Sequence, residues 1–252
     1  MEKRGQVAIF IIVAVVAVVA VVLFFLLRGS VFGGGDDIPV QVEEVYDYVS
    51  LCIEEVGANS LYYVAAHGGY YGSLPSANVE GVFPIYYFRG NGNFPMMSKI
   101  AEELEDFMED QLVLCLDDFS SLGNYDIVAR SVKAKVEVSD EEIIFDVEYP
   151  LSIKRADETY VLKNFEGIKI DYRFGEIYTI IQDIIFEQMD HDSVCLTCLY
   201  DAAYEEDLYV DMYDYDENTV VFVFEDKNAV HKDETFKWVF ANEYNWEDVE
   251  RL

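Results

Sequence analysis

A single apolar segment constrains this chain more than any other feature of its sequence. The segment begins at Val7, ends at Leu27, and contains no charged or polar side chain, no Gly and no Pro. At a rise of about 1.5 Å per residue, a helix of this length spans roughly 31 Å, close to the thickness of the hydrocarbon core of a bilayer. The sequence therefore predicts a transmembrane helix over residues 7–27, with the lipid bilayer as its partner.

The charges on either side of this segment predict its orientation. Lys3 and Arg4 precede it, and Arg28 is the only basic residue that follows it closely. Basic residues collect on the cytoplasmic side of membrane proteins, so we expect a cytoplasmic leader over residues 1–6 and the rest of the protein outside the cell. Secretory signal peptides have a shorter apolar core and a small-x-small cleavage site. We therefore expect a single-pass anchor that is retained in the cell membrane.

The leader carries a further signal. Lys3-Arg4-Gly5-Gln6 leads directly into the apolar segment, and this arrangement resembles the class III signal peptides of archaeal type IV pilins and archaellins. The resemblance is confined to the N-terminal segment. It implies that a prepilin-type peptidase cuts after Gly5 and leaves Gln6 as the first mature residue. Bacterial-type pilins carry glutamate where this chain has Phe10, so the similarity is to the archaeal proteins.

A break follows the apolar segment. Residues 28–39, RGSVFGGGDDIP, contain consecutive glycines, two aspartates and a proline, and such a composition does not continue a helix. In pilins and archaellins the apolar helix continues without interruption and packs the core of a filament. We therefore expect a flexible tether over residues 28–39, and we favour a tethered surface domain over a filament subunit.

Residues 40–252 are predicted to form an acidic extracytoplasmic domain. The chain has 17 Lys and Arg against 49 Asp and Glu, for a formal net charge of −32. A charge of this sign repels nucleic acid, which is therefore not an expected partner. The chain is also 52% hydrophobic and 15% aromatic, so the domain is expected to fold. The acidity indicates a solvated, salt-adapted surface, with cation binding as the alternative.

Hydrophobic periodicity predicts an α+β fold. Apolar residues recur at helical spacing over residues 40–66, 98–117, 176–189 and 193–206. They alternate, as in half-buried strands, over residues 132–138, 145–153, 168–174, 208–215, 219–225 and 236–244, and residues 85–88 form a further short strand. Ser98 is expected to cap its helix. The short polar turns indicate an antiparallel sheet with helices packed on one face.

The body of the chain combines a tethered helix that carries Cys52, a Gly-Gly-Tyr loop at residues 68–70, an acidic helix ending in Leu114-Cys115-Leu116, and strands that include Tyr149-Pro150. This combination is similar to uncharacterised membrane-anchored surface proteins of small-genome archaea. The similarity implies an archaeal cell-surface setting and one domain, and it implies no function.

The four cysteines are Cys52, Cys115, Cys195 and Cys198. An even number outside the cytoplasm suggests disulfides. Cys52 and Cys115 each lie on the apolar stripe of a predicted helix, so packing of the two helices would bring them together. Cys195 and Cys198 have a spacing that permits a local bridge. Buried free thiols are the alternative, because the second pair also belongs to an ordinary apolar helical stripe.

Two segments match metal-binding patterns in part. Residues 190–198 contain His, two Asp and a C-x-x-C pair, but a structural zinc site needs further ligands, and a redox motif follows a strand rather than a helix. The oxygen ligands of a calcium loop are matched by Asp214, Asp216, Asn218 and Glu225. Thr219 replaces the glycine of that loop, and residues 220–224 form a predicted strand. We expect a polar hairpin turn there, and no metal or cofactor in either segment.

Tyrosine clusters are the remaining candidates for binding. Tyr70, Tyr71, Tyr86 and Tyr87 occur in adjacent pairs, and tyrosines beside carboxylates can contact sugars or proteins, although most are expected to pack in the core. No hydrolase motif or phosphate-binding loop is recognisable. We therefore favour a non-enzymatic binding or cell-envelope structural role, with a surface protein, a glycan or further copies of the chain as partner. A pilin-like filament subunit processed after Gly5 and an extracytoplasmic hydrolase are the alternatives.

Overall fold

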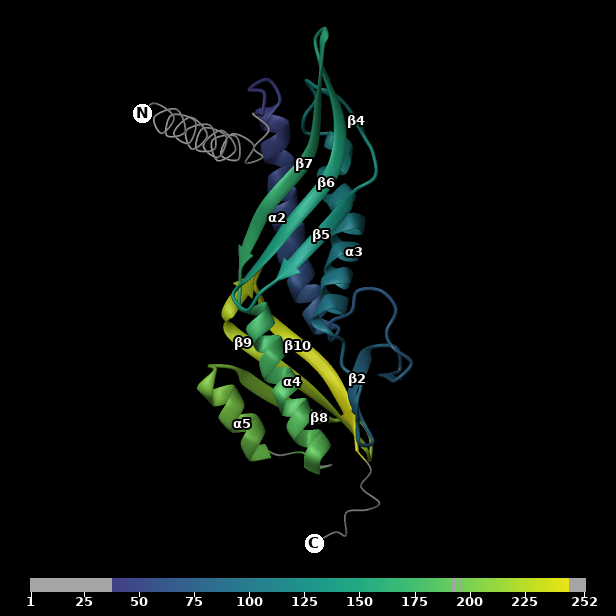
Figure 1. Ribbon diagram of the computed structural model, residues 1–252, viewed down its shortest axis with the longest axis vertical. Helices are drawn as coiled ribbons and strands as arrows, with labels where there is room; N and C mark the ends of the chain where they lie inside the picture. The colour runs from purple at the N-terminus through teal and green to yellow at the C-terminus, as the bar shows by residue number, and fades with distance from the viewer. Residues whose placement is uncertain (1–37, 192–193, 195, 245–252) are drawn as a thin grey trace, which may run out of the picture. The chain divides into compact units, whose positions relative to one another are not determined.

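The computed structural model describes residues 38–191, 194 and 196–244. The predicted leader, the apolar segment and most of the tether lie outside these residues. The chain divides into two units, residues 1–43 and 44–252, and the second unit holds the α+β domain (Figure 1). No helix in the described part of the chain is both long enough and apolar enough to cross a membrane.

The four helices of the domain follow the predicted periodicity. They are α2 (Glu43–Ala66), α3 (Met97–Leu116), α4 (Phe174–His191) and α5 (Leu196–Glu205), and the short 3-10 turn η1 (Asp117–Phe119) follows α3. The prediction that Ser98 caps α3 was wrong. The residue that precedes the helix is Met96, which has extended backbone angles and makes no capping hydrogen bond through its side chain.

A four-stranded antiparallel sheet contains the predicted consecutive strands. It consists of β4 (Asp126–Ala129), β5 (Lys133–Val138), β6 (Glu142–Arg155) and β7 (Glu158–Asp171). Strand β6 pairs with all three others. The predicted extension of the last strand to Phe174 was wrong, because β7 ends at Asp171 and Phe174 begins α4. There it is buried against Trp238 of the second sheet, with ring centroids 5.0 Å apart.

The second sheet is mixed rather than antiparallel. It consists of β1 (Asn78–Val79), β2 (Phe83–Phe88), β3 (Asn91–Gly92), β8 (Tyr209–Asp214), β9 (Thr219–His231) and β10 (Glu234–Glu243). Strands β8, β9 and β10 pair antiparallel, as chain neighbours joined by tight turns do, whereas β2 pairs parallel to β10. The expectation of one antiparallel sheet is therefore corrected, because periodicity identifies strands without identifying partners that are distant in sequence.

Helices α2 and α3 pack against the four-stranded sheet. Gly57 permits close approach of α2, since a Cβ atom there would lie 2.7 Å from Cδ1 of Ile170 and 3.0 Å from the ring of Phe145. Helix α3 lies along the outer edge of β5. Glu105 accepts a hydrogen bond from the backbone N–H of Val136 at 3.0 Å, and Glu109 accepts one from Ala134 at 3.1 Å. These carboxylates occupy backbone donors that would otherwise be open to another strand.

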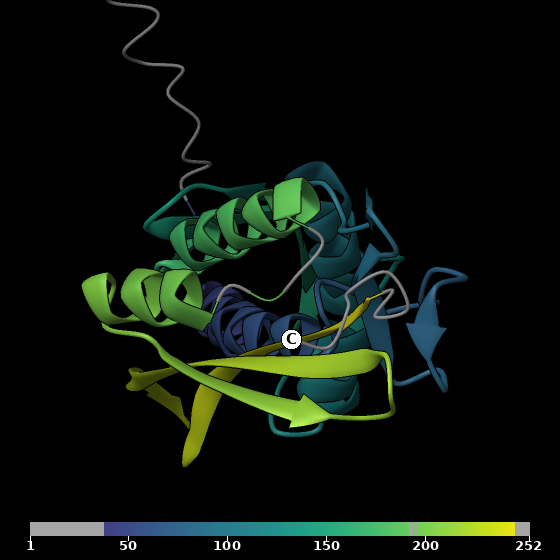
Figure 2. The ribbon, with the colours of Figure 1, turned by 90° about the horizontal axis from the view of Figure 1, so that it is seen from below.

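Helix α4 packs on the mixed sheet, and α5 lies beside α4 and β8 (Figure 2). Trp238 of β10 contacts Phe174 and Tyr178 of α4, and its indole N–H donates to the Tyr86 hydroxyl at 3.1 Å. Tyr86 stacks on Phe240 with ring centroids 4.4 Å apart. This aromatic core packs β2 beside β10, the strand with which it pairs in parallel.

Candidate functional site

A cleft of about 580 Å³ lies where the two sheets meet α2. It is bounded by α2, the C-terminal end of β7 and the second half of β9. The apolar residues that line it are Ala58, Leu61, Ile170, Ala229 and Val230. Its volume is that of a typical small-molecule site, and the mixture of an apolar wall with a few polar groups is also typical.

A bulge in β9 shapes one wall of the cleft. Thr235 of β10 pairs with Val230, and the adjacent Phe236 pairs with Asp226, so residues 227–229 of β9 have no partners in β10. The backbone N–H of Asn228 turns back to Asp226 and donates to its Oδ1 at 3.0 Å. Bulges of this kind re-aim side chains beside functional sites, and this one carries Asn228 to the cleft.

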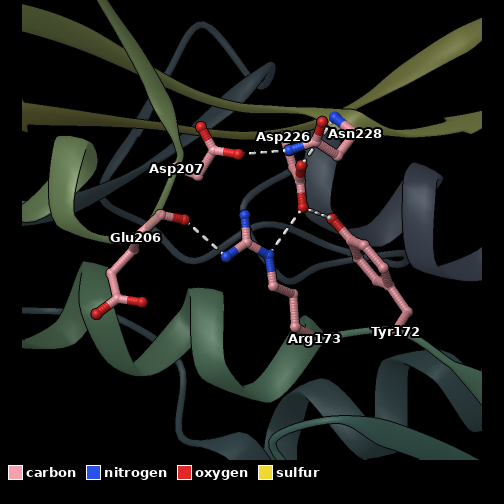
Figure 3. A network of polar contacts seen from close by, with 6 residues as sticks. All are labelled: Tyr172, Arg173, Glu206, Asp207, Asp226 and Asn228. Atoms are coloured by element: carbon pink, nitrogen blue, oxygen red, sulfur yellow. Dashed lines mark hydrogen bonds and ion pairs between the residues drawn. The ribbon is translucent and has the colours of Figure 1, made fainter.

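A buried ion pair lies at the back of the cleft (Figure 3). Asp226 is 3% exposed, and its Oδ2 accepts a hydrogen bond from Nε of Arg173 at 2.9 Å. Nη1 of the same guanidinium donates to the backbone carbonyl of Glu206 at 2.7 Å. Asn228 donates through Nδ2 to Asp207 at 2.7 Å. The network therefore ties the start of α4 to β9 and to the entry of β8.

Two tyrosines face this ion pair. The Tyr172 hydroxyl donates to Oδ2 of Asp226 at 3.4 Å, and burial, followed by the negative charge of Asp226, raises the pKa of Tyr172. Burial and the charge of Asp226 also raise the pKa of Tyr62. Both hydroxyls are therefore protonated donors at neutral pH. The Tyr62 hydroxyl lines the cleft and forms no hydrogen bond with any residue in the described ranges.

The open rim of the cleft is acidic. Glu141 and Asp171 are exposed on the side of the four-stranded sheet. His231 lies on the opposite side, where its ring is 5.5 Å from that of Tyr62 and its Nε2 is 3.1 Å from Oδ1 of Asn59. Because the positive charge of Arg173 is already matched by Asp226, the open rim disfavours anions.

The predicted binding tyrosines lie elsewhere. Tyr86 and Tyr87 are fully buried and Tyr70 is 9% exposed, so these three side chains pack in the core instead of lining a surface. Tyr71 is half-buried, and its hydroxyl contacts Asp110 and Gln111 of α3. None of the four lines the cleft.

One of the two predicted disulfides is present. Cys52 and Cys115 are bonded and join α2 to α3, with their Cα atoms 5.9 Å apart. The second predicted bridge cannot be followed, since Cys195 and the side chain of Cys198 lie outside the described residues. The predicted cleavage site between Gly5 and Gln6 also lies outside them.

The calcium-loop match is a hairpin turn, as expected. Strands β8 and β9 flank it, and a carboxylate oxygen of Asp216 accepts the backbone N–H groups of Asn218 and Thr219 at 2.8 Å. Glu225 is far along β9, where it pairs with Tyr209. In the part of the chain that the structure describes, no group of three or more His, Cys, Asp or Glu residues is placed to hold a metal ion.

The sequence analysis missed the residues of the cleft, although one signal pointed to them. Asp226 continues the inward-facing positions of β9, after the buried Phe222 and Phe224. A carboxylate at such a position needs a partner, and Arg173 is the nearest preceding cation in the sequence. Comparisons with family models, curated proteins and solved structures found no match to this chain.

Proposed function

We propose that this protein is a membrane-anchored cell-surface protein whose outer domain binds a ligand in the cleft between α2, β7 and β9 without reacting with it. The observation that carries the proposal is the Tyr62 hydroxyl, a half-buried donor that lines the cleft and has no partner among the described residues. A hydroxyl that donates to no acceptor in the described part of the protein is available to a ligand. A ligand oxygen beside Tyr62 would accept this hydrogen bond.

The groups around the cleft favour a neutral, hydroxyl-rich ligand such as a short glycan. The ring of Tyr62 and the aliphatic wall suit the C–H face of a sugar, and planar polar groups such as the Asn228 amide suit its hydroxyls. The exposed carboxylates of Glu141 and Asp171 disfavour acidic sugars and phosphates.

A binding measurement on the full-length protein in nanodiscs tests this proposal. We expect an array of neutral glycans to contain ligands that bind saturably, and Tyr62→Phe to weaken them about fivefold, because one neutral hydrogen bond contributes about 1 kcal/mol. Tyr63→Phe is the matched control, since Tyr63 lies on the other side of α2 beside His67 and Phe107. Equal effects of the two substitutions, or no saturable binding, would refute the cleft as the site.

The membrane location rests on the apolar segment over residues 7–27, and the Cys52–Cys115 disulfide supports a domain outside the cytoplasm. Protease treatment of intact cells should remove the domain and leave cytoplasmic proteins intact. Protection of the domain in intact cells, with digestion only after lysis, would place it in the cytoplasm instead.

The pilin-like leader supports a second candidate function, that of a filament subunit. N-terminal sequencing of the native protein separates the two candidates: Gln6 as the first residue favours the pilin-like route, and Met1 favours the plain anchor. Electron microscopy of sheared cell-surface material then tests assembly directly. Filaments that contain this chain would overturn the tethered binding domain.

A further inference from the structure

A second hollow lies between α4 and α5, away from the cleft. Its volume is about 440 Å³, and its apolar residues are Ile180 and Ile184 of α4 and Ala202 of α5. Carboxylates line both sides of it. They are Asp183 and Glu187 on α4, with Asp201, Glu205 and the adjoining Glu206 on the side of α5. We call this feature the α4–α5 groove.

The carboxylates of the α4–α5 groove are not neutralised by any basic residue that the structure describes. Residues 174–226 contain 15 Asp and Glu residues and no Lys or Arg. No described residue forms an ion pair with any of the five groove carboxylates. Figure 3 shows the side chain of Glu206 directed away from Arg173. The guanidinium of Arg173 donates to the backbone carbonyl of Glu206 and leaves the Glu206 carboxylate without that cation.

Carboxylates elsewhere in the domain are used differently. On α3, Glu105 and Glu109 accept backbone N–H groups of β5, and Glu109 also pairs with Lys133 at 2.7 Å. The groove carboxylates make no such contacts with the rest of the described chain. A hollow lined by charges of one sign concentrates the electrostatic field and attracts opposite charge. The groove therefore has an apolar floor and a negative rim on each side.

We propose that the α4–α5 groove docks a basic amphipathic helix of a partner protein. Aliphatic side chains of that helix would lie on the half-buried Ile180 and Ala202, with Ile184 buried beneath them, and Lys or Arg on its two flanks would pair with the two rims. The negative charge of the groove excludes two other classes of partner. A second copy of this chain, at a net charge of −32, and an anionic lipid surface are both repelled.

The spacing of the charges favours a helix over a single cation. Asp183 and Glu187 are one turn apart on α4, and Asp201 and Glu205 are one turn apart on α5. Charges that repeat along two helices match cations that repeat along a third. A metal ion instead requires its ligands to converge on one point.

Fluorescence anisotropy with the full-length protein in neutral-lipid nanodiscs tests the proposal. The probe is a labelled synthetic amphipathic helix with Leu on one face and Lys on both flanks. We expect saturable binding that weakens steeply between about 0.01 and 0.15 M salt, as the Debye length falls from about 30 to about 8 Å. A second probe with Ser in place of Leu should bind at least about tenfold more weakly, because it cannot use the apolar floor.

Two variants with the same change in charge locate the site. The groove variant combines Asp183→Asn, Glu187→Gln, Asp201→Asn and Glu205→Gln. The control variant combines Asp47→Asn, Glu54→Gln, Asp157→Asn and Glu166→Gln, all at exposed positions outside the groove. We expect the groove variant to lose about tenfold or more in affinity and the control variant less than about twofold.

Three results would overturn the proposal. Equal losses in the two variants would mean that the probe responds only to net charge. Equal binding of the Leu and Ser probes would remove the apolar floor from the interaction. Tight binding of Ca²⁺ that the groove variant abolishes would make the groove a cation site. The substitutions replace exposed side chains, so circular dichroism should show an unchanged fold in both variants.

Discussion

Replacement of Asp226 by Asn tests whether the ion pair at the back of the cleft holds the two sheets together. Asparagine keeps the size of the side chain and an acceptor for the backbone N–H of Asn228. It removes the negative charge that lies 2.9 Å from Nε of Arg173. The guanidinium then remains next to a neutral amide in a largely buried position.

The expected cost follows from the burial of the two partners. Removal of one member of a fully buried pair typically costs about 3–5 kcal/mol, because the other charge is left uncompensated. Arg173 is 24% exposed and retains its bond to the Glu206 carbonyl, so water and that carbonyl recover part of the loss. We expect Asp226→Asn to lower the free energy of unfolding by about 2–3 kcal/mol, and Tm by roughly 5–10 °C for a domain of this size.

Urea unfolding of the full-length protein, followed by tryptophan fluorescence, measures this loss, because Trp238 is buried in the core beside α4. Asp207→Asn is the matched control. Asp207 is an exposed member of the same network whose carboxylate accepts, within the described ranges, only from the Asn228 amide, and its substitution should lower the free energy of unfolding by less than about 0.5 kcal/mol. The double variant with Arg173→Gln should lose less than the sum of the two single variants. Additive losses, or a cost for Asp226→Asn equal to that of the control, would refute the reasoning.

Three further predictions concern stability. Burial raises the pKa of Glu103, but the N–H groups of Gly72 and Tyr71 and the charge of Lys99 outweigh it and hold that pKa below its usual value. This carboxylate therefore contributes its full stabilisation above its ordinary pKa of 4.5 and loses it as the pH falls through its lowered pKa. Thermal unfolding should show the Tm difference between wild type and Glu103→Gln closing as the pH is lowered below about 4.5. A variant with Cys52→Ala and Cys115→Ala should lose up to about 4 kcal/mol in urea unfolding, since the bond closes a loop with a sequence separation of 63. Reductant should lower the urea midpoint of the wild type by more than that of the variant, because the variant has already lost this bond. Gly68→Ala should lower the free energy of unfolding by about 3 kcal/mol, because Gly68 has φ +60 and an added Cβ would lie 2.8 Å from the Val239 carbonyl oxygen. Gly81→Ala, at φ +76 in open space, should lower it by about 1 kcal/mol. Equal losses would show that the contact with Val239 is irrelevant.

Local patterns in the sequence predicted the elements well, and the reason is physical. The helical spacing of Val45, Val49 and Ile53 reports which side of a helix is buried, and these three residues are fully buried in α2. The same logic placed Cys52 and Cys115 on helix faces that meet, and the disulfide confirms it. Hydrophobic periodicity depends only on near neighbours in the chain, so it can be interpreted without knowledge of the tertiary structure.

Strand pairing and the cleft required contacts between distant residues. Ile85 of β2 pairs with Ala241 of β10 because the aromatic core brings them together, and no local pattern specifies that parallel register. Tyr86 illustrates the error for the binding tyrosines: its adjacent pair looked like a surface cluster, but its ring stacks on Phe240 and its hydroxyl donates to the Gly68 carbonyl.

The sequence alone predicts an apolar segment that fits a bilayer, and it determines a strongly acidic domain and the order of helices and strands, because each depends on composition or on neighbours in the chain. The prediction that the protein is anchored in the cell membrane also rests on the sequence alone. Only the tertiary structure shows that Tyr62, Arg173 and Asp226 meet in one cleft, and that the charges of α4 and α5 lie on either side of one groove. Those sites exist only where elements far apart in the chain pack together, so their chemistry appears only when the chain is folded.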